Sequence, residues 1–417
     1  MKKILVSGPV LSQSGYGEQS RFALRALRTR PDLYDVYINP LSWGQTTWIT
    51  EDSEERNWID SCIKKFVAFK ESGLNFDASL QITIPNEWQQ LAPVNIGYTA
   101  GIETNRIAPV WIEKGNIMDR IIVVSNHSKN VYQDTSYGVK NERTGKIEGF
   151  GIKAPVDVVG YPVRKIEPVD LDLNLEYDFN FLVVAQWGPR KNLANTIKWF
   201  IEEFRNEEVG LVLKINVANN SIIDMNKSLK KLKENLEPFG DRKCKIYMLH
   251  GDMLTQEMAS LYHHPKIKAL INISHGEGYG LPIFEAAYSG LPVVTIGWSG
   301  QVDFLYAPSY DKKKKRNVVK PHFASVQYEL KPIAKEAVWS GVLEEGSLWA
   351  YAHEGNYKIK IRDMYVEYGR YKKLARQLKE HVEINFSEEK VYEKFVSSVE
   401  SCFGLSPVEE DVQVMVI

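Results

Sequence analysis

The chain has 417 residues, of which 44% are hydrophobic and 25% are charged, and its formal net charge at pH 7 is −1. This length predicts two or three domains, and the near-neutral charge excludes binding to nucleic acid or membrane through overall charge alone. Three scattered cysteines favour neither a zinc site nor a disulfide framework. No apolar run approaches the about 20 residues of a membrane span. The start, MKKILVSGPV, is too short for a signal peptide, so we expect a cytoplasmic protein.

Apolar, strand-like runs alternate with helical periods along most of the chain. In the first half the predicted strands are KKILVSG, YDVYIN, DASLQIT, NIGYTA and RIIVVS, and the predicted helices are EQSRFALRALRT and SKNVYQDTSYG. In the second half the strands are NFLVVAQ, LVLKIN, KIYMLHG, IKALINI and PVVTIG, and the helices are KNLANTIKWFIEEF, SLKKLKENL, TQEMASLYHH and PIFEAAYSG. The alternation predicts an α/β protein with two doubly wound parallel-sheet (Rossmann-like) domains facing across a cleft.

The expected domain boundary lies near residue 165. Residues 162–178 contain two prolines and mixed charge without a period, which indicates an interdomain linker. We therefore expect an N-terminal domain at residues 1–165 and a C-terminal domain at 166–385. Beyond these, a helix at about 386–403 should pack back on the first domain, and residues 404–417 form a tail without a predicted role.

The stretch ISHGEGYGLPIFEAAYSGLP joins a buried strand to a helix through a turn that contains Gly276, Gly278 and Gly280. Glycine permits positive φ and close approach of a ligand, and the start of a helix attracts phosphate. Glu277 in the turn and Glu285 in the helix would repel phosphate, but they suit neutral hydroxyls through charge-assisted hydrogen bonds. A nucleotide-sugar, with a diphosphate between two polyhydroxylated rings, fits both features. The alternative is a solvated turn with a helix salt bridge.

Other well-known motifs are absent from the sequence. There is no GxxxxGK[ST], GxSxG or HExxH, which disfavours a P-loop hydrolase, an α/β-hydrolase and a zinc protease. The loop after the first strand contains Gly15 and Gly17 but no GxGxxG, which disfavours a dinucleotide oxidoreductase.

The motif S-x-x-E-G-Y-G-L-P-x-x-E-A resembles the donor-site signature of retaining GT-B glycosyltransferases of family 4, the glycogen-synthase and sucrose-synthase group. FLVVAQWGPRKN resembles the strand and basic diphosphate-binding turn of that family, LHGDMLTQEMASLY its nucleotide-base loop, and WSGQVDF its small-residue and acidic motif. The resemblance covers most of the second half and the first half loosely. It implies an acceptor-side N-terminal domain and a donor-binding C-terminal domain. The co-substrate would be a UDP- or GDP-linked sugar, with no cofactor and no metal.

The resemblance also implies roles for individual residues. Glu277, Arg190 and Lys191 would be catalytic: Glu277 would contact the donor sugar, and the two cations would neutralise the diphosphate and the charge that grows on it. Glu285 would hold the ribose. The resemblance implies contacts to the donor sugar and diphosphate from Gly15, Gly17, Gly278, Tyr279, Gly280 and Leu281. It implies contacts to the nucleotide from Gly251 and Met253. An ordinary turn at Gly15 and Gly17, and a solvated helix start at Arg190 and Lys191, are the structural alternatives.

The sequence departs from the family pattern in two places. Gln186 and Trp187 stand near the position of an additional arginine. The segment GYTAGIETNRI lacks the histidine that many members have there, and Glu103 or Thr104 are candidates for a sugar or acceptor contact in its place. A helix-capping role is an equal alternative for Thr104.

The acceptor is the least predictable part of the function. The first half is rich in tryptophan, and the only strong charge run is the tract of Lys312, Lys313, Lys314, Lys315 and Arg316. Such a run is usually a solvated loop, but it is also a candidate contact for a polyanion such as DNA. YTAGIETNRI and VAQWGPRKN further resemble glycosyltransferase-like proteins of tailed phages, some of which glycosylate hydroxymethylated pyrimidines in DNA. We rank a saccharide or lipid-linked glycan first, modified DNA second, and a catalytically degenerate nucleotide-sugar-binding protein third.

Overall fold

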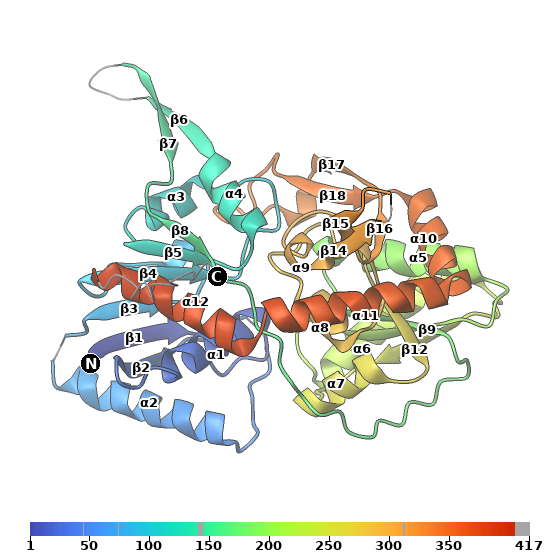
Figure 1. Cartoon of the computed structure of the whole chain (residues 1–417), viewed down its shortest axis with the longest axis horizontal. Helices are drawn as coiled ribbons and strands as arrows, with labels where there is room; N and C mark the ends of the chain where they lie inside the picture. The colour runs from blue at the N-terminus through green and yellow to red at the C-terminus, as the bar shows by residue number, and fades with distance from the viewer. Residues whose placement is uncertain (45, 74, 141–144, 312, 405–417) are drawn as a thin grey trace, which may run out of the picture.

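The computed structural model describes residues 1–404 except residues 45, 74, 141–144 and 312. Within these residues, two six-stranded parallel sheets with flanking helices lie side by side along the long axis of the molecule (Figure 1). This arrangement confirms the predicted fold class. All ten strands predicted from the apolar runs are present, and all of them except the edge strand at Lys245–Leu249 contain buried residues, as expected for parallel sheets covered by helices.

The N-terminal sheet has the strand order β2-β1-β3-β4-β5-β8 among the described residues, and every pair is parallel. The strands are β1 (Lys2–Gly8), β2 (Tyr34–Pro40), β3 (Ala78–Gln81), β4 (Val94–Thr99), β5 (Arg120–Val123) and β8 (Val156–Val158). The helices are α1 (Gly15–Arg28), α2 (Glu54–Glu71), α3 (Pro109–Gly115) and α4 (Asn126–Asp134), with a short η1 (Pro85–Glu87). A hairpin of β6 (Ser136–Lys140) and β7 (Ile147–Gly151) projects from this domain (Figure 1).

The C-terminal sheet has the order β11-β10-β9-β12-β13-β16 among the described residues. Its strands are β9 (Asn180–Gln186), β10 (Gly210–Asn216), β11 (Lys245–Leu249), β12 (Ile267–Asn272), β13 (Val293–Ile296) and β16 (Ala324–Val326). The helices are α5 (Leu193–Phe204), α6 (Ile222–Leu236), α7 (Thr255–His263), α8 (Leu281–Ser289), α9 (Val302–Leu305) and α10 (Glu354–Val366). Short helical turns are η2 (Pro189–Lys191), η3 (Glu237–Phe239) and η4 (Lys335–Ala337), and two hairpins pair β14 (Tyr306–Asp311) with β15 (Arg316–Pro321) and β17 (Tyr328–Pro332) with β18 (Leu348–Ala352).

The end of the chain returns to the first domain. Residues 159–179, all of them described, contain no helix or strand and lead from one sheet to the other. After α11 (Tyr368–Asn385), which packs on α8, helix α12 (Glu388–Glu400) packs on α1 and is followed by η5 (Ser401–Phe403). The ring of Phe395 on α12 lies 5.4 Å from the rings of Phe22 and Tyr98. In Figure 1 the consecutive red helices α11 and α12 thus lead from the C-terminal domain back to the N-terminal domain.

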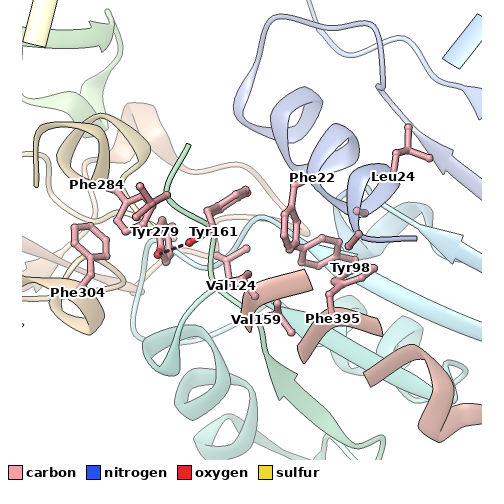
Figure 2. Packing of buried hydrophobic residues seen from close by; sticks show 14 of the residues in the cluster. Phe22, Leu24, Tyr98, Val124, Val159, Tyr161, Tyr279, Phe284, Phe304 and Phe395 are labelled. Atoms are coloured by element: carbon pink, nitrogen blue, oxygen red, sulfur yellow. Dashed lines mark hydrogen bonds between the residues drawn. The ribbon is translucent and has the colours of Figure 1, made fainter. Parts of the chain in front are cut away.

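A cluster of aromatic side chains joins the two domains (Figure 2). The ring of Tyr161, which follows β8, lies 5.8 Å from Phe22 on α1 and 5.0 Å from Tyr279 in the loop before α8. Tyr279 in turn lies 5.2 Å from Phe284 and 5.0 Å from Phe304. The domains thus share a continuous apolar core at this point.

The structure differs from the predicted elements in several short or exposed helices and strands. The segment SKNVYQDTSYG is not one helix: α4 ends at Asp134 because Thr135 is extended, and Ser136 begins β6. Glu367 separates α10 from α11. Helix α2 and the three hairpins were not predicted, because they lack the long buried runs that identify the central strands. Across the described part of the chain, no helix is both long and apolar enough to cross a membrane.

Candidate functional site

The strand order of the C-terminal sheet reverses at β9, which has β10 on one side and β12 on the other. In doubly wound sheets, ligands bind beyond the carboxyl ends of the strands at such a point. The turn after β9 is η2, and the segment after β12 is the glycine-rich loop of residues 273–280. The backbone of His275 in that loop donates a hydrogen bond of 2.8 Å to the carbonyl of Arg190 in η2. The fold therefore brings the two motif segments together.

Glu277 is the centre of this junction and is only 5% exposed. Its Oε1 accepts a hydrogen bond of 2.5 Å from Lys191 Nζ, and its Oε2 accepts one of 3.0 Å from Arg190 Nη1. A third donor, Asn272 Nδ2, lies 3.3 Å from Oε1. Burial alone would raise the pKa of Glu277, but Lys191 and Arg190 outweigh burial and hold it at about 2. The carboxylate is therefore ionised at neutral pH.

Arg190 carries the network across to the N-terminal domain. Its Nη2 lies 2.9 Å from Glu103 Oε1, in the loop after β4, and its Nη1 donates a bond of 2.7 Å to the carbonyl of Gly276. Burial opposes the charge on Arg190, but Glu103 and Glu277 outweigh it and raise its pKa. For Lys191, burial and the neighbouring Arg190 prevail and lower its pKa. The four side chains form a compact group with two positive and two negative charges.

The glycines of the loop allow two backbones to meet. A Cβ atom on Gly276 would lie 2.1 Å from the carbonyl oxygen of Glu103, and one on Gly278 would lie 2.3 Å from that of Ala100. Ser125 Oγ donates a bond of 2.8 Å to the carbonyl of Gly278. The close approach that these two glycines permit in the structure is thus to the N-terminal domain. Gly280, at φ +88°, is the one of the three with a left-handed backbone, and it precedes α8.

The other residues expected near the sugar and diphosphate lie at helix starts, except Tyr279, which precedes α8 by two residues. Leu281 is the first residue of α8, and the side chain of Tyr279 is buried in the interdomain aromatic cluster (Figure 2). Gly15 and Gly17 form the first turn of α1, where Ser14 Oγ accepts a bond of 3.1 Å from the Gly17 N–H. A Cβ atom on Gly17 would lie 1.9 Å from the carbonyl oxygen of Ser12, whereas one on Gly15 would meet nothing within 4 Å.

Glu285 lies one turn into α8 and is partly buried. Its Oε2 accepts a hydrogen bond of 2.6 Å from the hydroxyl of Tyr262 on α7. Burial raises the pKa of Glu285 to about 7, with a further contribution from Glu18 on α1. The two glutamates of the motif therefore differ: Glu277 is held as an anion, whereas Glu285 titrates near neutral pH.

Gly251 and Met253 lie in the loop after β11. Gly251 has φ +122°, and its carbonyl accepts a bond of 2.6 Å from Lys214 Nζ at the end of β10. Asp252, between them, lies 3.2 Å from Thr47 Oγ1 of the N-terminal domain. The loop thus lies where the ends of β10 and β11 meet a loop of the other domain.

Three remaining predicted residues or segments lie apart from this network or play local roles. Thr104 Oγ1 donates a bond of 2.8 Å to the carbonyl of Arg106, and α3 begins only at Pro109, so Thr104 caps no helix. Residues 313–315 form the turn between β14 and β15, and Arg316 is the first residue of β15; all four are exposed. Lys312 lies outside the described residues. No group of three or more His, Cys, Asp or Glu side chains suited to a metal ion occurs within the part of the chain that the structure describes.

The sequence patterns did not identify two histidines beside the site. His275 lies between Trp349 (5.4 Å between ring centroids) and Tyr351 (4.3 Å), and its Nδ1 is 2.9 Å from the carbonyl of Ala350. His127, which follows β5, lies 3.1 Å from the carbonyl of Thr104, and burial lowers its pKa to about 4. Only the position of His275 inside the motif gave a signal.

Comparison of the sequence with known families gives no match to a family model, and no curated protein matches it either. The fold, in contrast, is similar to that of several solved structures. Sucrose-phosphate synthase from Thermosynechococcus elongatus superposes with a TM-score of 0.62 at 13% identity, covering 97% of this chain and 100% of that one. Anabaena HepE in complex with UDP-glucose gives 0.55 at 13% identity, covering 96% and 100%.

The lipopolysaccharide outer core galactosyltransferase WaaB gives a TM-score of 0.53 at 11% identity, covering 96% of this chain and 99% of that one. Each similarity extends over nearly the whole of both chains and includes both sheets. The protein therefore has the two-domain GT-B fold.

Proposed function

We propose that this protein is a retaining glycosyltransferase that transfers a sugar from a nucleoside-diphosphate sugar to a hydroxyl of a saccharide or lipid-linked glycan. The observation that carries the proposal is the buried group of Arg190, Lys191 and Glu277 at the point where the strand order reverses. Cations placed there suit a diphosphate, and a carboxylate beside them suits sugar hydroxyls. One structural neighbour supports a UDP-linked donor, since Anabaena HepE was solved in complex with UDP-glucose.

Donor binding would rearrange the charge network. In the free protein Arg190 and Lys191 are neutralised by Glu277 and Glu103. A diphosphate would compete for these cations and leave the carboxylates free to accept hydrogen bonds from hydroxyls. The sugar would then lie against Glu277, with the loop of Gly278 to Leu281 beside it. Glu285 and the Gly251–Met253 loop would hold the ribose and the base.

The chemistry follows from this placement. The bond between the anomeric carbon and the β-phosphate oxygen breaks, and Arg190 and Lys191 stabilise the charge that develops on the departing diphosphate. The acceptor hydroxyl attacks from the same face, its oxygen forms the new bond to the anomeric carbon, and its proton passes to the departing phosphate. The configuration is therefore retained. The reaction needs no cofactor other than the donor.

A second candidate function is transfer to hydroxymethylated pyrimidines in DNA. The exposed basic turn that ends at Arg316 favours it, because four consecutive described cations can contact phosphates. The target base would have to leave the helical stack, which costs a few kcal/mol, roughly. A third candidate is a degenerate protein that binds a nucleotide-sugar without transferring it; the presence of both glutamates and both cations disfavours it.

The test is to incubate the protein with a panel of UDP- and GDP-sugars and follow slow donor hydrolysis by proton NMR. We expect one donor to be hydrolysed and its product to have the donor's anomeric configuration in the first minutes, before the free sugar equilibrates. Inversion would exclude the retaining mechanism and would favour Glu103, the carboxylate that the N-terminal domain places beside Arg190, as a general base. Binding of a donor without hydrolysis or transfer would favour the degenerate protein, and binding of no donor at all would exclude the proposed function.

A further inference from the structure

Residues 327–352 leave the C-terminal domain after β16, form the β17–β18 hairpin and its long connection, and return to α10. Residues 333–347 connect the two strands of the hairpin, and we call them the 333–347 loop. Strand β18 is tied to the donor side of the site: the Ala350 N–H donates a bond of 2.9 Å to the carbonyl of His275, two residues before Glu277. Figure 1 shows this hairpin at the junction of the two domains.

The 333–347 loop is also bound to the N-terminal domain. Asn86 Nδ2 donates a bond of 2.8 Å to the carbonyl of Gly341, and Arg106 Nε donates one of 3.2 Å to Ser347 Oγ. Just beyond the loop, the Leu348 N–H donates a bond of 2.7 Å to Asn105 Oδ1. Asn105 and Arg106 belong to the same segment as Glu103. The loop therefore spans the two domains on the side where Glu103 and Arg190 meet.

The loop passes close to the diphosphate turn. Cα atoms of η4, within the loop, lie within 8 Å of those of η2, which contains Arg190 and Lys191. Trp339 follows the end of η4 by two residues, so its Cα lies at most about 8 Å further along the chain. A bound acceptor must reach the donor sugar beside these same cations.

Trp339 is 59% exposed, although its backbone is firmly held. The backbone N–H of Trp339 donates a hydrogen bond of 3.0 Å to the carbonyl of Leu343. The backbone N–H of Leu343 donates one of 2.7 Å to the carbonyl of Trp339. The preceding Val338 is 38% exposed. On a fixed backbone the tryptophan side chain has only two rotatable bonds, so it loses little conformational entropy when it contacts a ligand, and exposed tryptophans commonly anchor binding sites for this reason.

The charge of the segment distinguishes between ligands. Residues 327–352 contain two lysines and four glutamates, a net charge of −2. Such a surface repels a polyanion, whereas a neutral sugar ring can lay its C–H face on the indole and direct its hydroxyls to nearby carboxylates.

Resting on the proposed function, we propose that the 333–347 loop forms an acceptor subsite in which Trp339 stacks on a ring of a neutral saccharide. The acceptor would then be bound by both domains, with its reactive hydroxyl directed toward Glu103 and Arg190.

The proposal is tested by comparing the parent with Trp339→Ala, Trp339→Phe and Tyr310→Ala on an array of neutral oligosaccharides. Tyr310 on β14 is 63% exposed and serves as the matched control for loss of an exposed aromatic side chain. We expect Trp339→Ala to weaken saccharide binding and to raise the acceptor KM about tenfold without changing kcat. Trp339→Phe should recover most of the binding, and Tyr310→Ala should match the parent.

UDP binding and donor hydrolysis are measured in parallel, so that the two proposals can fail separately. A parent that binds no UDP contradicts the proposed function, whatever the array shows. Equal saccharide binding by the parent and Trp339→Ala would overturn the subsite. The subsite would also be overturned if the parent bound UDP but none of the oligosaccharides. The same holds if Trp339→Ala lost binding to hydroxymethylated duplex DNA and not to a saccharide.

Discussion

Replacing Glu277 with glutamine should lower the free energy of unfolding, whereas replacing Glu285 with glutamine should raise it. Glu277 is ionised and paired with two cations, so Glu277→Gln removes a favourable charge and leaves Lys191 without its closest partner. Glu285 is partly buried and has a hydroxyl, but no cation, within bonding distance in the described structure. Glu285→Gln should therefore relieve the cost of burying a charge once the pH is high enough to ionise the parent.

The magnitudes follow from the shifted pKa values. The pKa of Glu277 falls from 4.5 to about 2, and at about 1.4 kcal/mol per unit this corresponds to about 3 kcal/mol of stability. A lowered carboxyl pKa stabilises the fold above about pH 4.5, and this contribution is lost as the pH falls through 2. The pKa of Glu285 rises from 4.5 to about 7, so its contribution is present below pH 4.5 and is lost as the pH rises through 7.

Urea unfolding of the parent and both variants at pH 5 and pH 8 tests this reasoning. At pH 8 we expect Glu277→Gln to be less stable than the parent by about 3 kcal/mol and Glu285→Gln to be more stable by about 1–3 kcal/mol. At pH 5 the effect of Glu277→Gln should persist, and that of Glu285→Gln should largely vanish. If both variants shift stability in the same direction at pH 8, the assignment of one paired and one unpaired buried carboxylate is wrong.

Three further predictions concern donor hydrolysis and ligand binding. Lys191→Ala should slow donor hydrolysis about a hundredfold by removing one of two cations at the diphosphate. The control variant Lys358→Ala removes a lysine paired with two glutamates elsewhere in the domain, and it should hydrolyse the donor as fast as the parent. Equal rates for the two variants would contradict the role of Lys191. In calorimetric titrations, Glu285→Gln should weaken UDP binding by about 1.5–3 kcal/mol at pH 8 but much less at pH 6, where the parent is mostly protonated; a loss independent of pH would count against ionised Glu285. Replacing residues 312–316 with serines should leave donor hydrolysis unchanged, and it should flatten the salt dependence of DNA binding only if DNA is the acceptor.

Much of the C-terminal half could be predicted from the sequence, because its signals are local. The apolar runs of β9 and β12 and the glycine and proline residues around α8 fix a strand–turn–helix unit within a few residues. The order of strands in a doubly wound sheet then brings Arg190, Lys191 and Glu277 to one edge.

The interdomain contacts could not be predicted, because they depend on how two domains with separate patterns fit together. Nothing near Glu103 in the sequence indicates that it pairs with Arg190, 87 residues later. Similarly, Gly276 and Gly278 suggested space for a ligand, whereas the structure shows the backbone of residues 100–103 against them. The contacts of the 333–347 loop could not be predicted for the same reason: the strand before it, β17, is short and exposed, and the loop's partners lie about 240 residues earlier.

The most direct test of the central claim is a calorimetric titration of UDP and GDP into the parent and into a variant that carries both Arg190→Gln and Lys191→Ala, with Lys358→Ala as the control. The account predicts that the parent and the control bind one of the two diphosphates equally well and that the double variant binds it at least a hundredfold more weakly, because both cations at the β9–β12 junction are lost. Equal affinity in all three proteins, or no binding of either diphosphate by the parent, would contradict the claim that this junction is a nucleotide-sugar site.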